Sequence, residues 1–133
     1  MIRRALSVIV GLLVAMLGIS LVELAGQALF APPAGVDMDD AASITRAVNR
    51  IPAGLKVSVV LAWFAGTLAG GSAGLAISRW TVLPWIVAAG VILGAIASYM
   101  QIPHPLWMQA AGIALPLLAA WLALHIMGRA EAR

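Results

Sequence analysis

Glu23 is the residue with the clearest potential for chemistry in this 133-residue chain. It follows an uncharged, apolar run from Ala5 to Val22, so its carboxylate lies near the end of a predicted membrane helix. Gln27 comes one helical turn later and shares its face. The helix is predicted to continue for about seven residues beyond Glu23, which places the acid roughly 10 Å below the following loop. An acid at this depth is expected to face other helices or to find a polar partner.

The partners that we expect for Glu23 come from the same end of the other helices. Lys56 begins the second predicted span and can extend its ammonium toward the membrane surface, and Trp63 and His104 can close over the carboxylate. The sequence therefore predicts a cluster of Glu23, Gln27, Lys56, Trp63 and His104, with Glu23 tied to Lys56 or His104. Its default role is to fix the rotation of the first helix, and the alternative is a proton-linked functional group.

The segment Gly70–Gly74 matches the pattern G-x-S-x-G, with Ser72 in the position of a nucleophile. In hydrolases this motif forms a strained turn between a strand and a helix, beside an oxyanion hole. Here the serine lies inside a predicted membrane helix. His125 lies at a similar depth, but Glu131 lies beyond the membrane end and cannot orient it. We therefore predict no catalytic residue and no enzymatic activity.

Neither the acidic segment nor the histidines predict a metal site. An EF-hand loop beginning at Asp37 would need glycine and glutamate where the chain has Ala42 and Val48. His104 and His125 lie at opposite ends of one predicted helix, and a lone histidine is a poor metal site. The chain has no cysteine, which excludes disulfides, thiolate catalysis and Cys-based metal sites. The sequence thus predicts no metal and no cofactor.

The elements that position these residues follow from composition. The chain is 63% hydrophobic and 10% charged, more apolar than a soluble domain whose surface must be wetted. No charge interrupts Val57–Ser78 or Trp80–Gly128, and the second run is too long for one span of about 20 residues. The two prolines of Gln101–Pro105 divide it. The prediction is a single all-α transmembrane domain over residues 1–133, a four-helix bundle with spans near 4–30, 55–78, 82–100 and 105–128.

The distribution of basic residues predicts the orientation of the bundle. One side of the four-span layout has five basic residues and the other has three, the latter offset by aspartates. The five are Arg3, Arg4, Arg79, Arg129 and Arg133, and the three are Arg46, Arg50 and Lys56. By the positive-inside bias both termini are cytoplasmic, so the net charge of +3 does not indicate nucleic-acid binding. The first apolar segment exceeds the core of about 7–15 residues in a signal peptide and is interpreted as a retained helix.

The first loop on the non-cytoplasmic side carries the pattern of a short amphipathic helix, near residues 38–50. Asp37 is the predicted N-cap, with Asp40 at the third helical position. The apolar residues that share one face are Ile44, Val48 and Ile51. This face is predicted to lie down on the membrane surface.

Small residues recur at every fourth position of the second predicted span. They are Ser58, Ala62, Gly66, Gly70, Gly74 and Ser78. Comparable residues in the third span are Gly90, Gly94 and Ser98, and those in the first are Ser7, Gly11 and Ala15. Such ridges let helix backbones approach closely, and helices in lipid associate by packing. We expect these residues to pack the bundle internally, with self-association through one ridge as the alternative.

Three stretches resemble, in order and spacing, a widespread group of small four-span bacterial membrane proteins. They are Glu23 followed by Ala31–Asp37 (APPAGVD), Leu61–Gly71 (LAWFAGTLAGG) and Ile102–Trp107 (IPHPLW). Members of the group tend to show Pro-x-Pro-x-G-x-D after the late acid, whereas Pro32 and Pro33 are adjacent here. The resemblance covers nearly the whole chain. It implies the bacterial inner membrane and the four-span layout, and it implies no activity.

Two functions fit these features. The first is an accessory or structural protein that acts through contacts with membrane lipid or another membrane protein. The second is a homo-oligomeric transporter or channel for small molecules or ions, with Glu23 as its coupling group. The small multidrug exporters also place an acid in the first of four short helices, but near mid-membrane, whereas Glu23 is predicted near the surface.

Overall fold

The computed structural model describes residues 1–131, with side chains described up to Arg129, and all regular secondary structure in this range is helical. The elements in order are α1 (Ile2–Leu29), α2 (Ala41–Ala47), the 3₁₀ helix η1 (Val48–Arg50), α3 (Ala53–Ser78), α4 (Leu83–Gln101) and α5 (Leu106–Glu131). Four of them, α1, α3, α4 and α5, are long and apolar enough to cross a membrane. The predicted all-α membrane bundle of four long helices is therefore confirmed.

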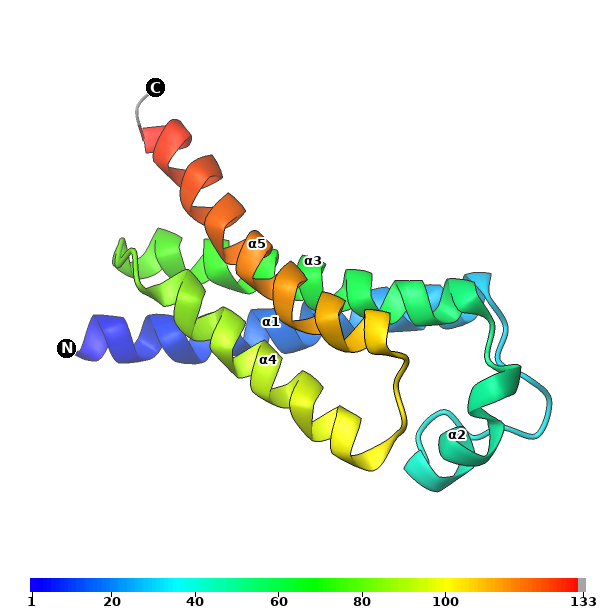
Figure 1. Ribbon diagram of the computed structural model, residues 1–133. Helices are drawn as coiled ribbons and strands as arrows, with labels where there is room; N and C mark the ends of the chain where they lie inside the picture. The colour runs from blue at the N-terminus through cyan, green and yellow to red at the C-terminus, as the bar shows by residue number, and fades with distance from the viewer. Residues whose placement is uncertain (132–133) are drawn as a thin grey trace.

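Figure 1 shows how the four long helices are arranged. α1 and α3 run side by side, and α4 and α5 cover one side of this pair. The start of α1, the α3–α4 turn and the last turns of α5 lie toward one end, which we call the terminal end. α2 and the α4–α5 loop lie at the other end, which we call the loop end.

The closest helix pair is α1 against α3, and its seam is made of small residues. A Cβ added at Gly66 would lie 2.6 Å from the carbonyl oxygen of Ala15, and one at Gly74 would lie 2.8 Å from that of Ser7. A Cβ at Gly70 would collide with the carbonyl oxygen of Gly11. Because the obstructing atoms belong to the backbone, only glycine permits this distance between the two helices.

The small residues predicted to form a ridge on α4 do not all pack against another helix. A Cβ at Gly90 would lie 2.8 Å from the side chain of Leu12, so α4 touches α1 at this level. Gly94, one turn later, is exposed, and nothing lies within 4 Å of where its Cβ would be. The expectation that Gly94 packs against another helix is wrong. Figure 1 shows the reason, since α4 diverges from α1 toward the loop end.

Charged side chains at the terminal end are held by neighbouring elements. The Nε of Arg3 donates a hydrogen bond of 2.6 Å to the carbonyl oxygen of Ile77. The guanidinium of Arg4 lies 5.1 Å from the ring centroid of Trp80, within the range of a cation–π interaction. α3 ends where Arg79 adopts a left-handed conformation with φ of 54° and donates its N–H to the carbonyl of Leu75. Arg133 lies outside the described residues.

The short helix α2 begins later than predicted. Its N-cap is Asp40, whose Oδ1 accepts a hydrogen bond of 3.2 Å from the N–H of Ala42. Asp37, the predicted cap, instead accepts from the N–H of Asp39 at 2.9 Å and donates its own N–H to Ser43. A local Asx turn thus uses the carboxylate that was assigned to the cap, and the helix starts only after it.

Candidate functional site

A cavity of about 350 Å³ occupies the loop end, between α1, α3, α4, the α2–η1 segment and the α4–α5 loop. Its wall is mostly apolar. The polar side chains in it are Glu23, Gln27, Lys56, Ser98 and His104. Volumes of about 300–1,000 Å³ with a few polar groups in an apolar wall are typical of small-molecule sites.

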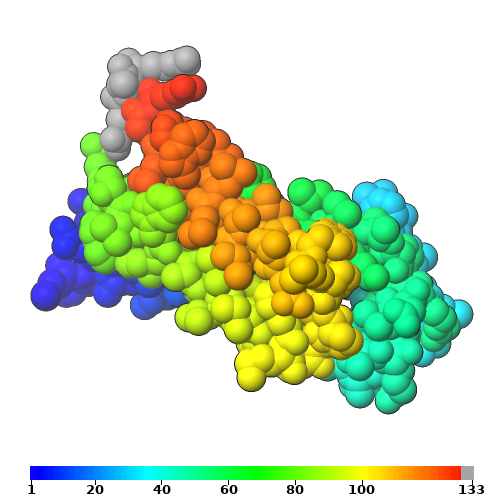
Figure 2. Space-filling model, viewed as in Figure 1, coloured from blue at the N-terminus to red at the C-terminus, as the bar shows by residue number. Residues whose placement is uncertain are grey.

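The cavity exists because two elements leave the bundle at this level. α4 diverges from α1, so Gly94 and Ser98 face open space rather than a neighbouring helix. The α2–η1 segment then covers the opening beside the α4–α5 loop (Figure 2). Its apolar residues, Ile44, Val48 and Ile51, line the cavity. The predicted orientation of this face, down onto the membrane surface, is therefore corrected: it faces the cavity.

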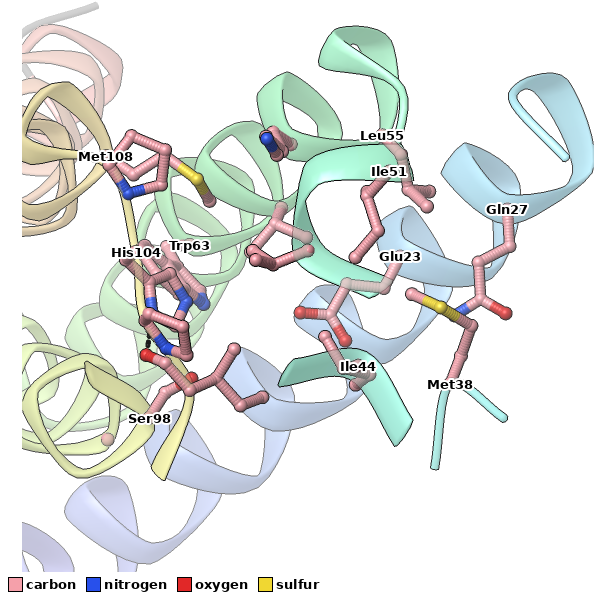
Figure 3. A pocket seen from close by; sticks show the side chains of 17 residues that line it. Glu23, Gln27, Met38, Ile44, Ile51, Leu55, Trp63, Ser98, His104 and Met108 are labelled. Carbon is pink, nitrogen blue, oxygen red and sulfur yellow. Dashed lines mark hydrogen bonds between the residues drawn. The ribbon is translucent and has the colours of Figure 1, made fainter. Parts of the chain in front are cut away.

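Glu23 projects from α1 into this space. Figure 3 shows its carboxylate directed between Ile44 and the rings of Trp63 and His104. The side chain is half-buried, and among the described residues it has no hydrogen bond or ion pair. Every fully buried side-chain nitrogen or oxygen in the described chain has a hydrogen-bond partner, so the carboxylate oxygens of Glu23 must retain accessible surface in the cavity.

The predicted tie between Glu23 and either Lys56 or His104 is not made. All five residues of the predicted cluster line one cavity, but Glu23 stays unpaired within the described chain. His104 is held by its own loop, since its Nδ1 lies 2.7 Å from the carbonyl oxygen of Ile102. Gln109 fixes the same loop by donating to the carbonyl of His104 at 3.0 Å. These polar groups of the α4–α5 loop are thus hydrogen-bonded locally, so the loop needs no bond from His104 to Glu23 on α1.

The tautomer of His104 follows from this contact. A carbonyl oxygen can only accept, so Nδ1 must carry the proton that it donates to Ile102. In the neutral ring Nε2 is then left as an acceptor. His104 therefore offers the site an acceptor and not a donor while its ring is uncharged.

Trp63, Tyr99 and His104 form an aromatic wall beside the cavity. The Tyr99 ring meets Trp63 edge to face at 6.0 Å and His104 at 4.9 Å between centroids. Its hydroxyl donates to the carbonyls of Met108 at 3.2 Å and Gln109 at 3.3 Å. These contacts join α3, α4 and α5, and so they fix the rings in place.

Sequence reasoning missed Tyr99 as part of this wall, and it missed Gly112, which lies against the wall. A Cβ at Gly112 would collide with the hydroxyl of Tyr99 and the ring of Trp63. Gly112 is therefore the position that lets the aromatic side chains approach α5. The sequence does show a glycine, Gly112, in the first half of the fourth predicted span. No repeat or spacing in the sequence, however, indicates that this glycine lies against Tyr99.

The other candidates for chemistry stay apart from the cavity and from one another. Ser72 lies half-buried in α3, and no hydrogen bond in the described chain joins it to His125. His125 packs over Trp121 at 3.9 Å between centroids, with Nδ1 3.1 Å from the Trp121 carbonyl. The side chain of Glu131 is outside the described set. Among described residues, no three His, Cys, Asp or Glu side chains gather as a metal site.

Comparison with protein-family models, with curated proteins and with solved structures finds no match. The chemistry of the cavity is therefore inferred from its own residues, their charges and their contacts.

Proposed function

We propose that this chain is a small accessory protein of the bacterial inner membrane, without catalytic activity, that acts through contacts with lipid or another membrane protein. The observation that carries the proposal is the cavity of about 350 Å³ at the loop end, with its mostly apolar wall and its unpaired carboxylate. A lone acid without an adjacent nucleophile or metal group suits binding better than catalysis.

In this proposal both termini are cytoplasmic, and the loop end is on the outer side. The terminal end carries Arg3, Arg4, Arg79 and Arg129, whereas three aspartates offset the basic residues of the loop end. The positive-inside bias supports this orientation. No cysteine occurs in the chain, so single cysteines at Asn49 and Gly128 give a clean test. A membrane-impermeant maleimide added to intact cells should label the Asn49→Cys variant and not the Gly128→Cys variant.

A second candidate is a homo-oligomeric transporter or channel for small molecules or ions, with Glu23 as the coupling group. The unpaired carboxylate in an accessible cavity favours it. The tight α1–α3 seam opposes it, because the contacts of Gly66, Gly70 and Gly74 leave no room for a path between these two helices. Apart from Glu23 and Gln27 the spans carry few polar residues, so a hydrated path would have to form between copies of the chain.

Filling the cavity tests the first proposal. Gly94 lines the cavity and has free space around it, while Ala97 is exposed on the same helix and is not part of the cavity wall. Wild-type protein and the Ala97→Leu variant, extracted in polymer nanodiscs, should retain the same lipids and partner proteins by native mass spectrometry. Gly94→Leu should lose them. Equal retention by all three would contradict the proposal, and a Glu23-dependent flux in proteoliposomes would favour the second candidate.

A further inference from the structure

Two opposite charges line the cavity without neutralising each other. Glu23 comes from α1 and Lys56 from α3, and no ion pair joins them in the described chain. A charge that is partly withdrawn from water into an apolar wall is unfavourable unless a counter-charge or hydrogen bond compensates it. A ligand with both an ammonium and an anionic group would compensate both residues at once.

Two further polar groups of the wall supply one hydrogen-bond donor and one acceptor. Trp63 lines the cavity beside His104, and its indole N–H has no acceptor among the described residues, so it can donate to a ligand. His104 has Nδ1 engaged with Ile102, so its free Nε2 can accept a hydrogen bond from a ligand. Two donors suit phosphate oxygens, which only accept. Two acceptors suit a primary ammonium, which has three N–H donors.

The rest of the wall suits the apolar part of a lipid. Ile44, Ile51, Leu55 and Val59 give the cavity aliphatic surface. The exposed Gly94 marks where α1 and α4 are apart, so acyl chains can leave the cavity toward the bilayer between these helices. A volume of about 350 Å³ is that of a small-ligand site, which fits a headgroup with its chains outside.

The level of the two charges agrees with a headgroup site. Glu23 lies about 9 Å before the end of α1, and Lys56 lies about 4.5 Å after the start of α3, at 1.5 Å per residue. α1 is about 42 Å long by the same rise, against a hydrocarbon core of about 30 Å. Both side chains therefore fall near the boundary between the acyl chains and the headgroups.

We infer that the cavity binds a zwitterionic phospholipid with a primary ammonium, of the phosphatidylethanolamine type. Glu23 accepts from the ammonium, Lys56 and Trp63 donate to the phosphate, and the acyl chains leave between α1 and α4. This inference rests on the proposed lipid-contact function and names the lipid class. A choline headgroup has no N–H to donate, and a glycerol headgroup has no positive charge, so both should bind less well.

The test is a lipid competition on the full-length protein. Wild-type protein in nanodiscs with equal amounts of phosphatidylethanolamine, phosphatidylcholine and phosphatidylglycerol should retain the ethanolamine lipid about tenfold over the other two, by native mass spectrometry. Glu23→Gln should reduce its retention to that of the choline lipid. Lys56→Gln should lower retention of all three. Asp39→Asn and Arg50→Gln change exposed charges at the same end outside the cavity and should leave the ranking unchanged.

Each arm has an outcome that overturns the inference. Equal retention of the three lipids by wild-type protein would overturn the inference, even if Glu23→Gln failed to fold. An unchanged lipid ranking in a folded Glu23→Gln variant would overturn it as well. Displacement of the lipid by an equal concentration of water-soluble glycerophosphoethanolamine would assign the cavity to a soluble ligand. Lipid retained without any headgroup ranking would leave the proposed function standing. Unchanged retention by Gly94→Leu would contradict the proposed function itself.

Discussion

The two ends of the bundle treat their charged side chains differently. At the terminal end, Arg3 donates to a backbone carbonyl of α3 and Arg4 lies over the ring of Trp80. At the loop end, Glu23 and Lys56 line a cavity without a hydrogen bond or ion pair in the described chain. Charges that have partners help to hold helices together. Charges that face an accessible cavity without partners remain available to a molecule from outside the chain.

Helix packing also differs between the closed α1–α3 seam and the loop end of α4. The α1–α3 seam is closed by glycines whose missing side chains let backbones touch, whereas α1 and α4 part beyond Gly90. The bundle is therefore closely packed where small residues face each other, and open where the same type of residue, Gly94, faces no helix. Small residues permit close approach but do not enforce it.

The largest expected effect is on the closed seam. Gly70→Leu should destabilise the bundle by about 3 kcal/mol or more, because even a Cβ at this position would meet the backbone of Gly11 and the side chain of Ala15. Ala69→Leu, at the exposed neighbouring position, is the matched control. Thermal unfolding of both variants in detergent measures the difference. Equal stability of the two variants would show that close packing at this seam does not stabilise the bundle.

A smaller effect is expected in the aromatic wall beside the cavity, formed by Trp63, Tyr99 and His104. Gly112→Ala should cost about 1–3 kcal/mol, because the added methyl displaces the hydroxyl of Tyr99 and the ring of Trp63. Gly128→Ala adds the same methyl to the same helix where nothing lies within 4 Å. Thermal unfolding should separate the two variants, and forms of each that keep Trp63 as their single tryptophan give the local fluorescence signal. An unperturbed Trp63 signal in Gly112→Ala would mean that the wall is loosely held.

The cover of the cavity should respond to loss of its helix cap. Asp40→Ala removes the acceptor for the N–H of Ala42 and should destabilise α2 by about 1 kcal/mol. Asp39→Ala is the control, because the side chain of Asp39 caps no helix. Amide hydrogen exchange over Ala42–Ala47 should accelerate in the first variant and not in the second. Equal exchange in the two variants would show that the Asp40 cap does not stabilise the segment that covers the cavity.

The smallest effect on stability is expected at Glu23. Glu23→Gln should change the free energy of unfolding by less than about 0.5 kcal/mol, because no ion pair is lost. Removing one member of a buried ion pair would instead cost about 3–5 kcal/mol. Thermal unfolding in lipid-free detergent distinguishes these cases. A loss of about 3–5 kcal/mol would show that Glu23 is paired. The two ends of the bundle would then not differ in whether their charged side chains have partners.

Much of the fold could be predicted because its signals are local. Uncharged runs such as Val57–Ser78 predict spans by length alone, and the observed α3 (Ala53–Ser78) differs from the predicted 55–78 only at its start. The gathering of Glu23, Lys56 and His104 at one end also follows from helix lengths and turn positions. The cap of α2 was misassigned because Asp37 and Asp40 are chemically alike, and a turn at Asp37 competes for the same carboxylate.

The sequence by itself determined that this chain crosses a membrane as four helices, because apolar segments of this length can satisfy their backbone groups in lipid only as helices. It also determined which faces could pack closely, because small side chains set a minimum distance between helix axes. Only the tertiary structure decided that α1 meets α3 along their length, that α4 leaves α1 after Gly90, and that Glu23 faces the resulting cavity without a partner in the described chain. The direction in which a helix diverges depends on contacts summed over the whole bundle, and no local period in the sequence encodes that sum.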